Sequence, residues 1–127
     1  MPKDEPSDGL GHRNDWECSV VWVDDPTKAA PTVVGLSASA HGGFSTIKSG
    51  FSTHFAGTRP FIEYISYWPL DHQLIISTTQ GGEQPLIAWE SMTFAARFSL
   101  ANYDFGSANV PFKDANFDSN LESAWNA

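Results

Sequence analysis

Residues 61–68 constrain the fold more than any other part of the chain. This run reads Phe-Ile-Glu-Tyr-Ile-Ser-Tyr-Trp and stops at Pro69. Aromatic and β-branched side chains favour a pleated, half-buried surface, and proline has no N–H with which to continue a strand ladder. The run therefore predicts a β-strand, and the chain must supply other strands to pair with it.

Further runs of strand length lie on both sides of this one. They cover residues 16–23, 32–38, 44–47, 51–55 and 74–79, and turn-forming residues separate them. Asp24, Asp25 and Pro26 follow the first run and are typical of a tight turn, because the acids bond to their own backbone and proline fixes φ. The sequence therefore predicts an antiparallel sheet over about residues 16–80 that starts with a hairpin.

Residues 85–100 fit two structures. Pro85 suits the first turn of a helix, and apolar side chains at positions 89, 92, 96 and 100 would then share one face. Alternate residues from 92 to 100 are also apolar, which is typical of a strand. The helix is the better fit for residues 85–92, and the rest of the segment stays open.

A short helix is predicted over residues 119–125, with Asp118 as its N-cap. The whole pattern predicts an α+β fold in which the antiparallel sheet is followed by one or two helices. An all-β sandwich, with residues 86–100 as a strand, is the alternative.

The length of 127 residues predicts one domain. Residues 1–14 are polar and contain two prolines and two glycines, so we expect a flexible tail followed by a single globular domain over residues 15–127. The net charge is −8. Nucleic-acid binding and attachment to an anionic membrane both need a basic face, so neither partner is expected.

The first residues lack the apolar run of a signal peptide, and no stretch is long and apolar enough to span a bilayer. We therefore expect a soluble, cytoplasmic protein. No cofactor-binding motif is present. The four histidines have none of the spacings typical of a metal site, so we expect neither a cofactor nor a metal ion.

His41 follows a predicted strand and lies among small residues, where an imidazole can act as a general base. Cys18 is the single cysteine, which excludes an intramolecular disulfide. It alternates with apolar residues along a predicted strand, so a buried structural thiol is the simpler interpretation.

Residues 40–45 read Ala-His-Gly-Gly-Phe-Ser and residues 64–69 read Tyr-Ile-Ser-Tyr-Trp-Pro. These two motifs, within a match over about residues 32–69, resemble permuted papain-like proteins, the group of the NlpC/P60 and lecithin-retinol-acyltransferase families. The resemblance implies a hydrolase or acyltransferase in which His41 activates a later cysteine. No cysteine follows His41, and Ser107 is the nearest hydroxyl to replace it. Serine is a poorer nucleophile, so the resemblance implies an impaired or inactive relative.

A non-enzymatic binding module is the alternative function. Tyr64, Tyr67 and Trp68 could line a groove for a carbohydrate or peptide, because aromatic rings pack on apolar faces. Tyr67 and Trp68 are adjacent in a strand and point to opposite faces, so only one of them can face a given groove. The acidic balance suits a basic protein partner, as in an inhibitor or immunity-type protein. The expected partner is a protein or a small molecule such as a carbohydrate, and the oligomeric state stays open.

Overall fold

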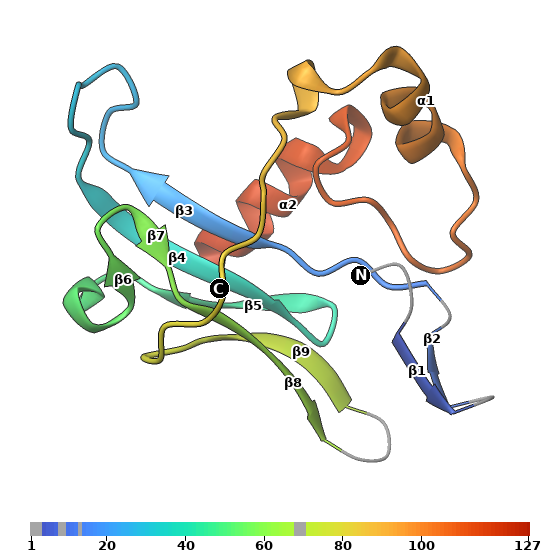
Figure 1. Cartoon of the computed structure of the whole chain (residues 1–127), viewed down its shortest axis with the longest axis horizontal. Coiled ribbons are helices and arrows are strands. Elements are labelled where there is room, and N and C mark those ends of the chain that lie inside the picture. The colour runs from blue at the N-terminus through green and yellow to red at the C-terminus, as the bar shows by residue number, and fades with distance from the viewer. Residues whose placement is uncertain (1–3, 8–9, 13, 68–70) are drawn as a thin grey trace.

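The computed structural model describes residues 4–7, 10–12, 14–67 and 71–127. Within these ranges the chain has an α+β architecture, with antiparallel strands followed by two C-terminal helices (Figure 1). The predicted fold class is therefore confirmed. No helix in the described ranges is long and apolar enough to cross a membrane.

The strands are β1 (Asp4–Ser7), β2 (Leu10–His12), β3 (Ser19–Val23), β4 (Val33–Ala40), β5 (Gly43–Ile47), β6 (Phe55–Ala56), β7 (Arg59–Pro60), β8 (Ile62–Tyr67) and β9 (Asp71–Ile76). Two short 3-10 helices, η1 (Phe51–Thr53) and η2 (Trp89–Ser91), and two α-helices, α1 (Phe94–Asn102) and α2 (Asp114–Asn126), complete the elements. Residues 1–14, which the sequence predicts as a flexible tail, contain the two paired strands β1 and β2.

The main sheet has the strand order β3-β4-β9-β8, and β5 also pairs with β4. All of its pairs are antiparallel. The β3–β4 hairpin joins the predicted strands around the turn at Asp24, whose carboxylate accepts the backbone N–H of Thr32 at 2.9 Å. The aromatic run becomes β8, paired with β9 along its whole length. The sequence therefore predicts β8, the strand at one end of this order.

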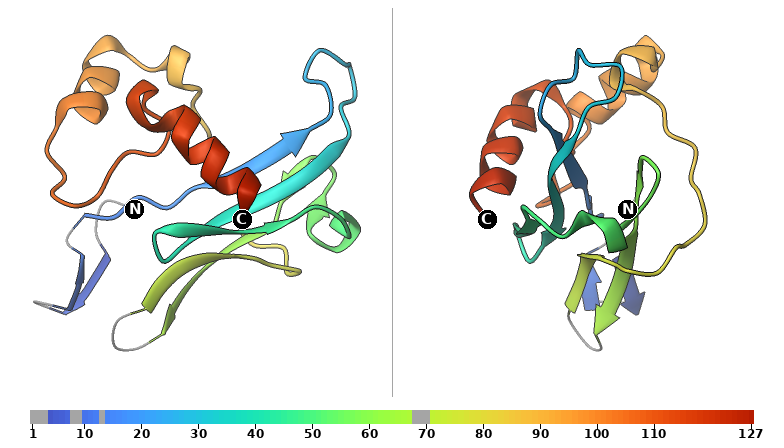
Figure 2. Two further views of the ribbon diagram at one scale, coloured as in Figure 1. Left: turned by 180° about the vertical axis from the view of Figure 1, so that it is seen from behind. Right: turned by 90° about the vertical axis from the view of Figure 1, so that its left-hand side faces the viewer.

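Helix α2 lies across one face of the sheet, over β4 and β5 (Figure 2). The Thr46 hydroxyl donates to the carbonyl oxygen of Ala124 at 2.7 Å. The Trp22 indole donates to the Ser37 hydroxyl at 3.0 Å, and its ring meets that of Trp125 with centroids 5.1 Å apart. These contacts fix the C-terminal end of α2 on the sheet.

Two helix predictions are wrong in position. The predicted helix over residues 85–92 is an extended segment that ends in the short turn η2. The α-helix begins only after Thr93, whose hydroxyl accepts the N–H of Ala96 at 3.2 Å and so caps α1. The last helix begins at Asp114 rather than after Asp118, because an acid in the first turn already suits the positive end of the helix dipole.

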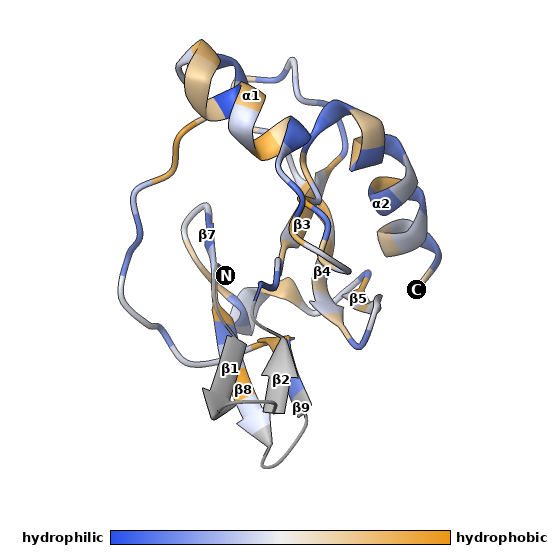
Figure 3. Cartoon of the chain, turned by 90° about the vertical axis from the view of Figure 1, so that its right-hand side faces the viewer, coloured by the Kyte–Doolittle hydropathy of each residue, from blue (hydrophilic) through white to orange (hydrophobic). Residues whose placement is uncertain are grey.

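The predicted strand over residues 51–55 is also largely wrong. Gly50 adopts a left-handed conformation with φ 75°, and the chain then makes the 3-10 turn η1 before the two-residue strand β6. The long segment of residues 77–88 has no helix or strand and passes on the side of the sheet opposite α2 (Figure 2). Its part just before η2 is coloured as hydrophobic in Figure 3.

Candidate functional site

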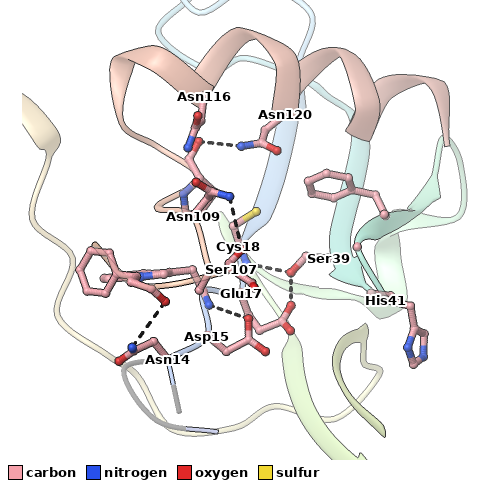
Figure 4. A pocket seen from close by; sticks show the side chains of 18 of the residues that line it. Asn14, Asp15, Glu17, Cys18, Ser39, His41, Ser107, Asn109, Asn116 and Asn120 are labelled. Carbon is pink, nitrogen blue, oxygen red and sulfur yellow. Dashed lines mark hydrogen bonds between the residues drawn. The ribbon is translucent and has the colours of Figure 1, made fainter. Parts of the chain in front are cut away.

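A pocket of about 1060 Å³ opens beside the turn between β4 and β5 (Figure 4). Its walls come from separate parts of the chain: residues 14–18 before β3, residues 39–44 around the turn, residues 105–109 and Pro111 after α1, three polar residues of α2, and His72 of β9. The fold therefore gathers into one cavity residues that lie more than a hundred positions apart in the sequence.

Two acidic side chains line this pocket, Asp15 and Glu17. Asp15 accepts the N–H of Trp16 at 2.9 Å. Glu17 accepts the hydroxyl of Ser39, and the same hydroxyl oxygen accepts the N–H of Cys18 at 2.9 Å. Ser39 therefore ties the acidic segment to strand β4 and fixes the Glu17 carboxylate at the pocket.

An aromatic cluster behind the acids fixes their position. The Trp16 ring meets Phe105 and Phe112 edge to face, with centroids 5.5 and 5.9 Å apart. Phe112 also meets Trp89 of η2 at 5.7 Å. Because Trp16 stands between the two acids in sequence, its packing against the loop after α1 sets where both carboxylates lie.

Side-chain amides hold the wall opposite. The Asn116 amide donates to the carbonyl oxygen of Val110, and the Asn120 amide donates to that of Pro111, both at 3.0 Å. These bonds attach the loop after α1 to the first turns of α2. The loop is therefore held in place at the pocket by its own backbone carbonyls.

Burial raises the pKa of the Cys18 thiol by more than its hydrogen bond with Ser39 lowers it, and the nearby Glu17 carboxylate adds a smaller rise. The thiol therefore stays protonated at neutral pH and is not an activated nucleophile. Among the described side chains no group of three or more histidines, cysteines and acids lies close enough together to hold a metal ion.

The two residues predicted for catalysis, His41 and Ser107, both line the pocket. His41 occupies the two-residue turn between β4 and β5 with φ 50°, followed by Gly42 with φ 74°, which is the backbone of a tight hairpin. Figure 4 shows the imidazole pointing away from Ser107. The fold brings these residues to one cavity without arranging them as a base and its nucleophile.

The three predicted binding aromatics have different positions. Tyr64 is exposed on β8, and its hydroxyl lies 2.7 Å from Nδ1 of His72, with the two rings stacked at 6.1 Å. Tyr64 is therefore not part of the pocket lining, but it contacts His72, which is. Trp68 and the side chain of Tyr67 lie outside the described residues.

The pocket residues that sequence reasoning missed are the two acids and the amides of α2. The signal for the acids was their spacing, since residues two apart on an extended segment point to the same side. The amides carried no signal, because their place at the pocket depends on how α2 docks.

Comparison with known proteins matches residues 1–124 to the family described as "Necrosis inducing protein (NPP1)". NLP effector protein 14 of Phytophthora capsici is 50% identical over 126 residues, which are 98% of this chain and 94% of that protein. The solved structure described as "NLPPya in complex with glucosamine" is 51% identical with a TM-score of 0.87, and a second one has NLPPya with mannosamine. The structure described as "non-toxic HaNLP3 protein" is 38% identical over 90% of this chain, with a TM-score of 0.83.

The chain spans only part of the solved relatives. It covers 58% of the NLPPya chain with glucosamine and 53% of the HaNLP3 chain. It covers a similar share of other curated relatives, such as 53% of NLP effector protein 10.

These matches contradict the resemblance to papain-like proteins and the hydrolase or acyltransferase function taken from it. The resemblance rested on two motifs within residues 32–69, whereas the family match and the fold match span nearly the whole chain. Aromatic strands recur in unrelated sheets, because strand formation favours the same residue types. The role of Ser107 as a nucleophile rested on that resemblance, whereas His41 was also a candidate base because it follows a strand among small residues.

The expected cytoplasmic location is contradicted as well. The matching family is described as necrosis-inducing and the relatives are named effector proteins, and proteins of that kind act outside the cell that makes them. The expectation rested on two absences in the sequence, an apolar run in the first residues and a stretch able to span a bilayer, and neither identifies a compartment.

Proposed function

Because this chain belongs to the necrosis-inducing protein (NPP1) family, we propose that it is a non-enzymatic effector whose acidic pocket binds an amino sugar. The observation that carries the proposal is the pair of carboxylates at the pocket, Asp15 and Glu17. The solved relative NLPPya, described with glucosamine and with mannosamine, supports the ligand class. The sequence analysis gave a non-enzymatic binding module as its alternative function. The proposal adopts that alternative and specifies an amino sugar as the ligand.

The positive charge of an amino sugar is complementary to the negative charge of the two carboxylates in the pocket lining. A protonated amino group forms short, charge-assisted hydrogen bonds with carboxylates, and these are about twice as strong as neutral ones. The net charge of −8 also attracts a small cation toward the pocket from a distance. A neutral hexose lacks both contributions and is expected to bind more weakly.

Sugars also need apolar surface and many hydrogen-bonding groups, and the pocket has both. Trp16, Phe44 and Phe105 are part of the lining, and aromatic rings pack on the C–H face of a sugar. Asn109, Asn116 and other polar side chains of the lining can pair with sugar hydroxyls. A cavity of about 1060 Å³ is large for one sugar ring and has room for further units of a glycan.

The fold alone does not decide whether a protein of this family is toxic. The HaNLP3 relative shares the fold at a TM-score of 0.83 and is described as non-toxic. Proteins that share this fold can therefore differ in toxicity, and function has to be argued from the site.

Calorimetric titration with glucosamine, glucose and N-acetylglucosamine tests the proposal. Glucosamine is expected to bind most tightly, because only its amino group is charged. The variant Glu17→Gln keeps the shape and the hydrogen bond from Ser39 but loses the charge, so it is expected to bind glucosamine about tenfold more weakly.

Glu122→Gln is the matched control, since Glu122 is exposed on α2 and is not part of the pocket lining. It removes the same charge and is expected to leave the affinity unchanged. Equal affinity for glucose and glucosamine, or an equal loss in both variants, would show that the two carboxylates do not select the ligand.

A further inference from the structure

Two residues of the β4–β5 hairpin lie side by side in the pocket. Ser39 and Phe44 are partners in the register of this hairpin, and both belong to the pocket lining. Side chains directly opposite each other in an antiparallel pair point to the same face of the sheet, with Cβ atoms about 5 Å apart. We call Ser39 and Phe44 the floor pair, because they present a hydroxyl group and a phenyl ring on one surface.

Helix α2 covers the neighbouring pair on that face and leaves the floor pair open. Ser37 and Thr46 are also register partners, and side chains two positions apart on a strand point the same way. Their hydroxyl groups bond to the carbonyl oxygen of Ala124 in α2. Ser37 is fully buried, whereas Ser39 and Phe44 are half-buried. The floor pair therefore lies where the covered part of the sheet ends and the pocket begins.

Phe44 differs from the other two large aromatic side chains of the lining. Trp16 meets Phe105 edge to face at 5.5 Å, and Phe105 also meets Tyr103 at 4.8 Å. Those rings therefore hold each other within the aromatic cluster. In the described part of the chain, no ring-to-ring contact involves Phe44. Its ring is therefore the aromatic surface of the lining that another ring does not occupy.

A carboxylate is held directly beside this ring. The Ser39 hydroxyl donates to the Glu17 carboxylate and accepts the N–H of Cys18 at 2.9 Å, as Figure 4 shows. Because Ser39 is the register partner of Phe44, the carboxylate bonded to Ser39 and the phenyl ring are neighbours. A ligand whose charged group pairs with Glu17 therefore has its adjoining atoms next to Phe44.

We propose that Phe44 is the platform that recognises the sugar ring in this pocket. The ammonium group of an amino sugar pairs with Glu17, and the C–H face of the same sugar packs on the Phe44 ring. The inference rests on the proposed function and adds the residue that binds the ring itself. Since packing on C–H groups does not depend on the amino group, Phe44 contributes equally to the binding of glucosamine and glucose, whereas Glu17 contributes to glucosamine alone.

NMR titration of Phe44→Leu with glucosamine and with glucose tests this division of roles. Leucine stays apolar but loses the flat ring, so both sugars are expected to bind about fivefold more weakly. Phe44→Tyr keeps the ring and is expected to keep the affinity of the parent chain. Glu17→Gln, measured alongside, is expected to weaken the binding of glucosamine and leave that of glucose unchanged.

Phe117→Leu is the matched control. Phe117 is 47% exposed on α2 and is not part of the pocket lining, so the same substitution there is expected to leave both affinities unchanged. Circular dichroism checks that each variant keeps the parent fold.

A second measurement uses the parent chain and does not depend on how a variant folds. Nuclear Overhauser effects are expected between the ring protons of Phe44 and the C–H protons on one face of bound glucosamine. None is expected from the ring protons of Phe117. A residue that only supports the fold would give no such contacts with the ligand.

The possible failures are distinguishable. Unchanged affinity for both sugars in Phe44→Leu, beside weaker glucosamine binding in Glu17→Gln, would overturn the platform and leave the proposed function standing. A loss for glucosamine alone, or an equal loss in Phe117→Leu, would also overturn it, because Phe44 would then act through the carboxylate or the fold. No binding of either sugar by the folded chain would overturn both this inference and the proposed function.

Discussion

At the scale of single residues, Gly35 is the position where a small side chain is most constrained. A Cβ added there would lie 2.7 Å from Cδ1 of the Trp22 indole, far inside ordinary contact. The indole has little freedom to move, because its N–H is bonded to Ser37 and its ring packs on Trp125. Because Gly35 has no side chain, the Trp22 ring can lie over the paired strands β3 and β4.

Gly35→Ala is expected to lower the free energy of unfolding by about 1–3 kcal/mol, the usual cost of overpacking a well-packed site. Urea denaturation followed by tryptophan fluorescence measures the change. Gly81→Ala is the control, because nothing lies within 4 Å of a Cβ built there. Similar midpoints for the two variants would contradict the close contact with Trp22.

At the same scale, the sequence indicates some site residues and hides others. His41 attracted attention because it is a histidine among glycines, and it does line the pocket. Asp15 and Glu17 were overlooked because acids near the start of a chain are usually solvated. Their significance depends on Ser39 and Phe105, which lie far away in sequence.

At the scale of elements, the docking of α2 depends on a few hydroxyl groups under its last turn. Thr46 bonds to the carbonyl oxygen of Ala124 at 2.7 Å, and Ser37 lies 3.2 Å from the same oxygen. A carbonyl in the last turn of a helix has no partner within the helix, so these hydroxyls satisfy it.

Thr46→Val removes the donor while keeping the side-chain shape. It is expected to cost about 1 kcal/mol of stability and to speed hydrogen exchange in α2. Thr79→Val is the control, since Thr79 is exposed and outside the main sheet. Unchanged exchange in α2 would contradict a role for the Thr46 hydroxyl in holding the helix on the sheet.

Elements with one clear periodicity were predictable, and those with two were not. The run 61–68 contains only strand-forming residues around its polar positions, and it became β8. Residues 85–100 fit both the helical and the strand period, and in the described chain the cap by the Thr93 side chain favours the helix α1 over a strand. The fold class survived these errors because the sheet comes first and the helices last.

At the scale of the whole molecule, the sequence predicted neither the pocket as a whole nor which apolar residues stay exposed. The pocket combines residues 14–18, 39–44 and 105–120, which only the docking of α2 and the loop before it brings together. Apolar residues such as those of a core also lie on the surface, and only the structure shows that the described chain leaves Leu86, Ile87 and Phe94 exposed. The two short motifs that suggested a papain-like hydrolase carried no information at this scale.

The most direct test of the acidic pocket as a sugar site is chemical-shift mapping of the isotope-labelled chain during titration with glucosamine. The account predicts saturable shifts at Asp15, Glu17 and the β4–β5 turn, much smaller shifts with glucose, and none at residues 80–87. Shifts that are the same for both sugars, or that concentrate away from the pocket lining, would contradict it.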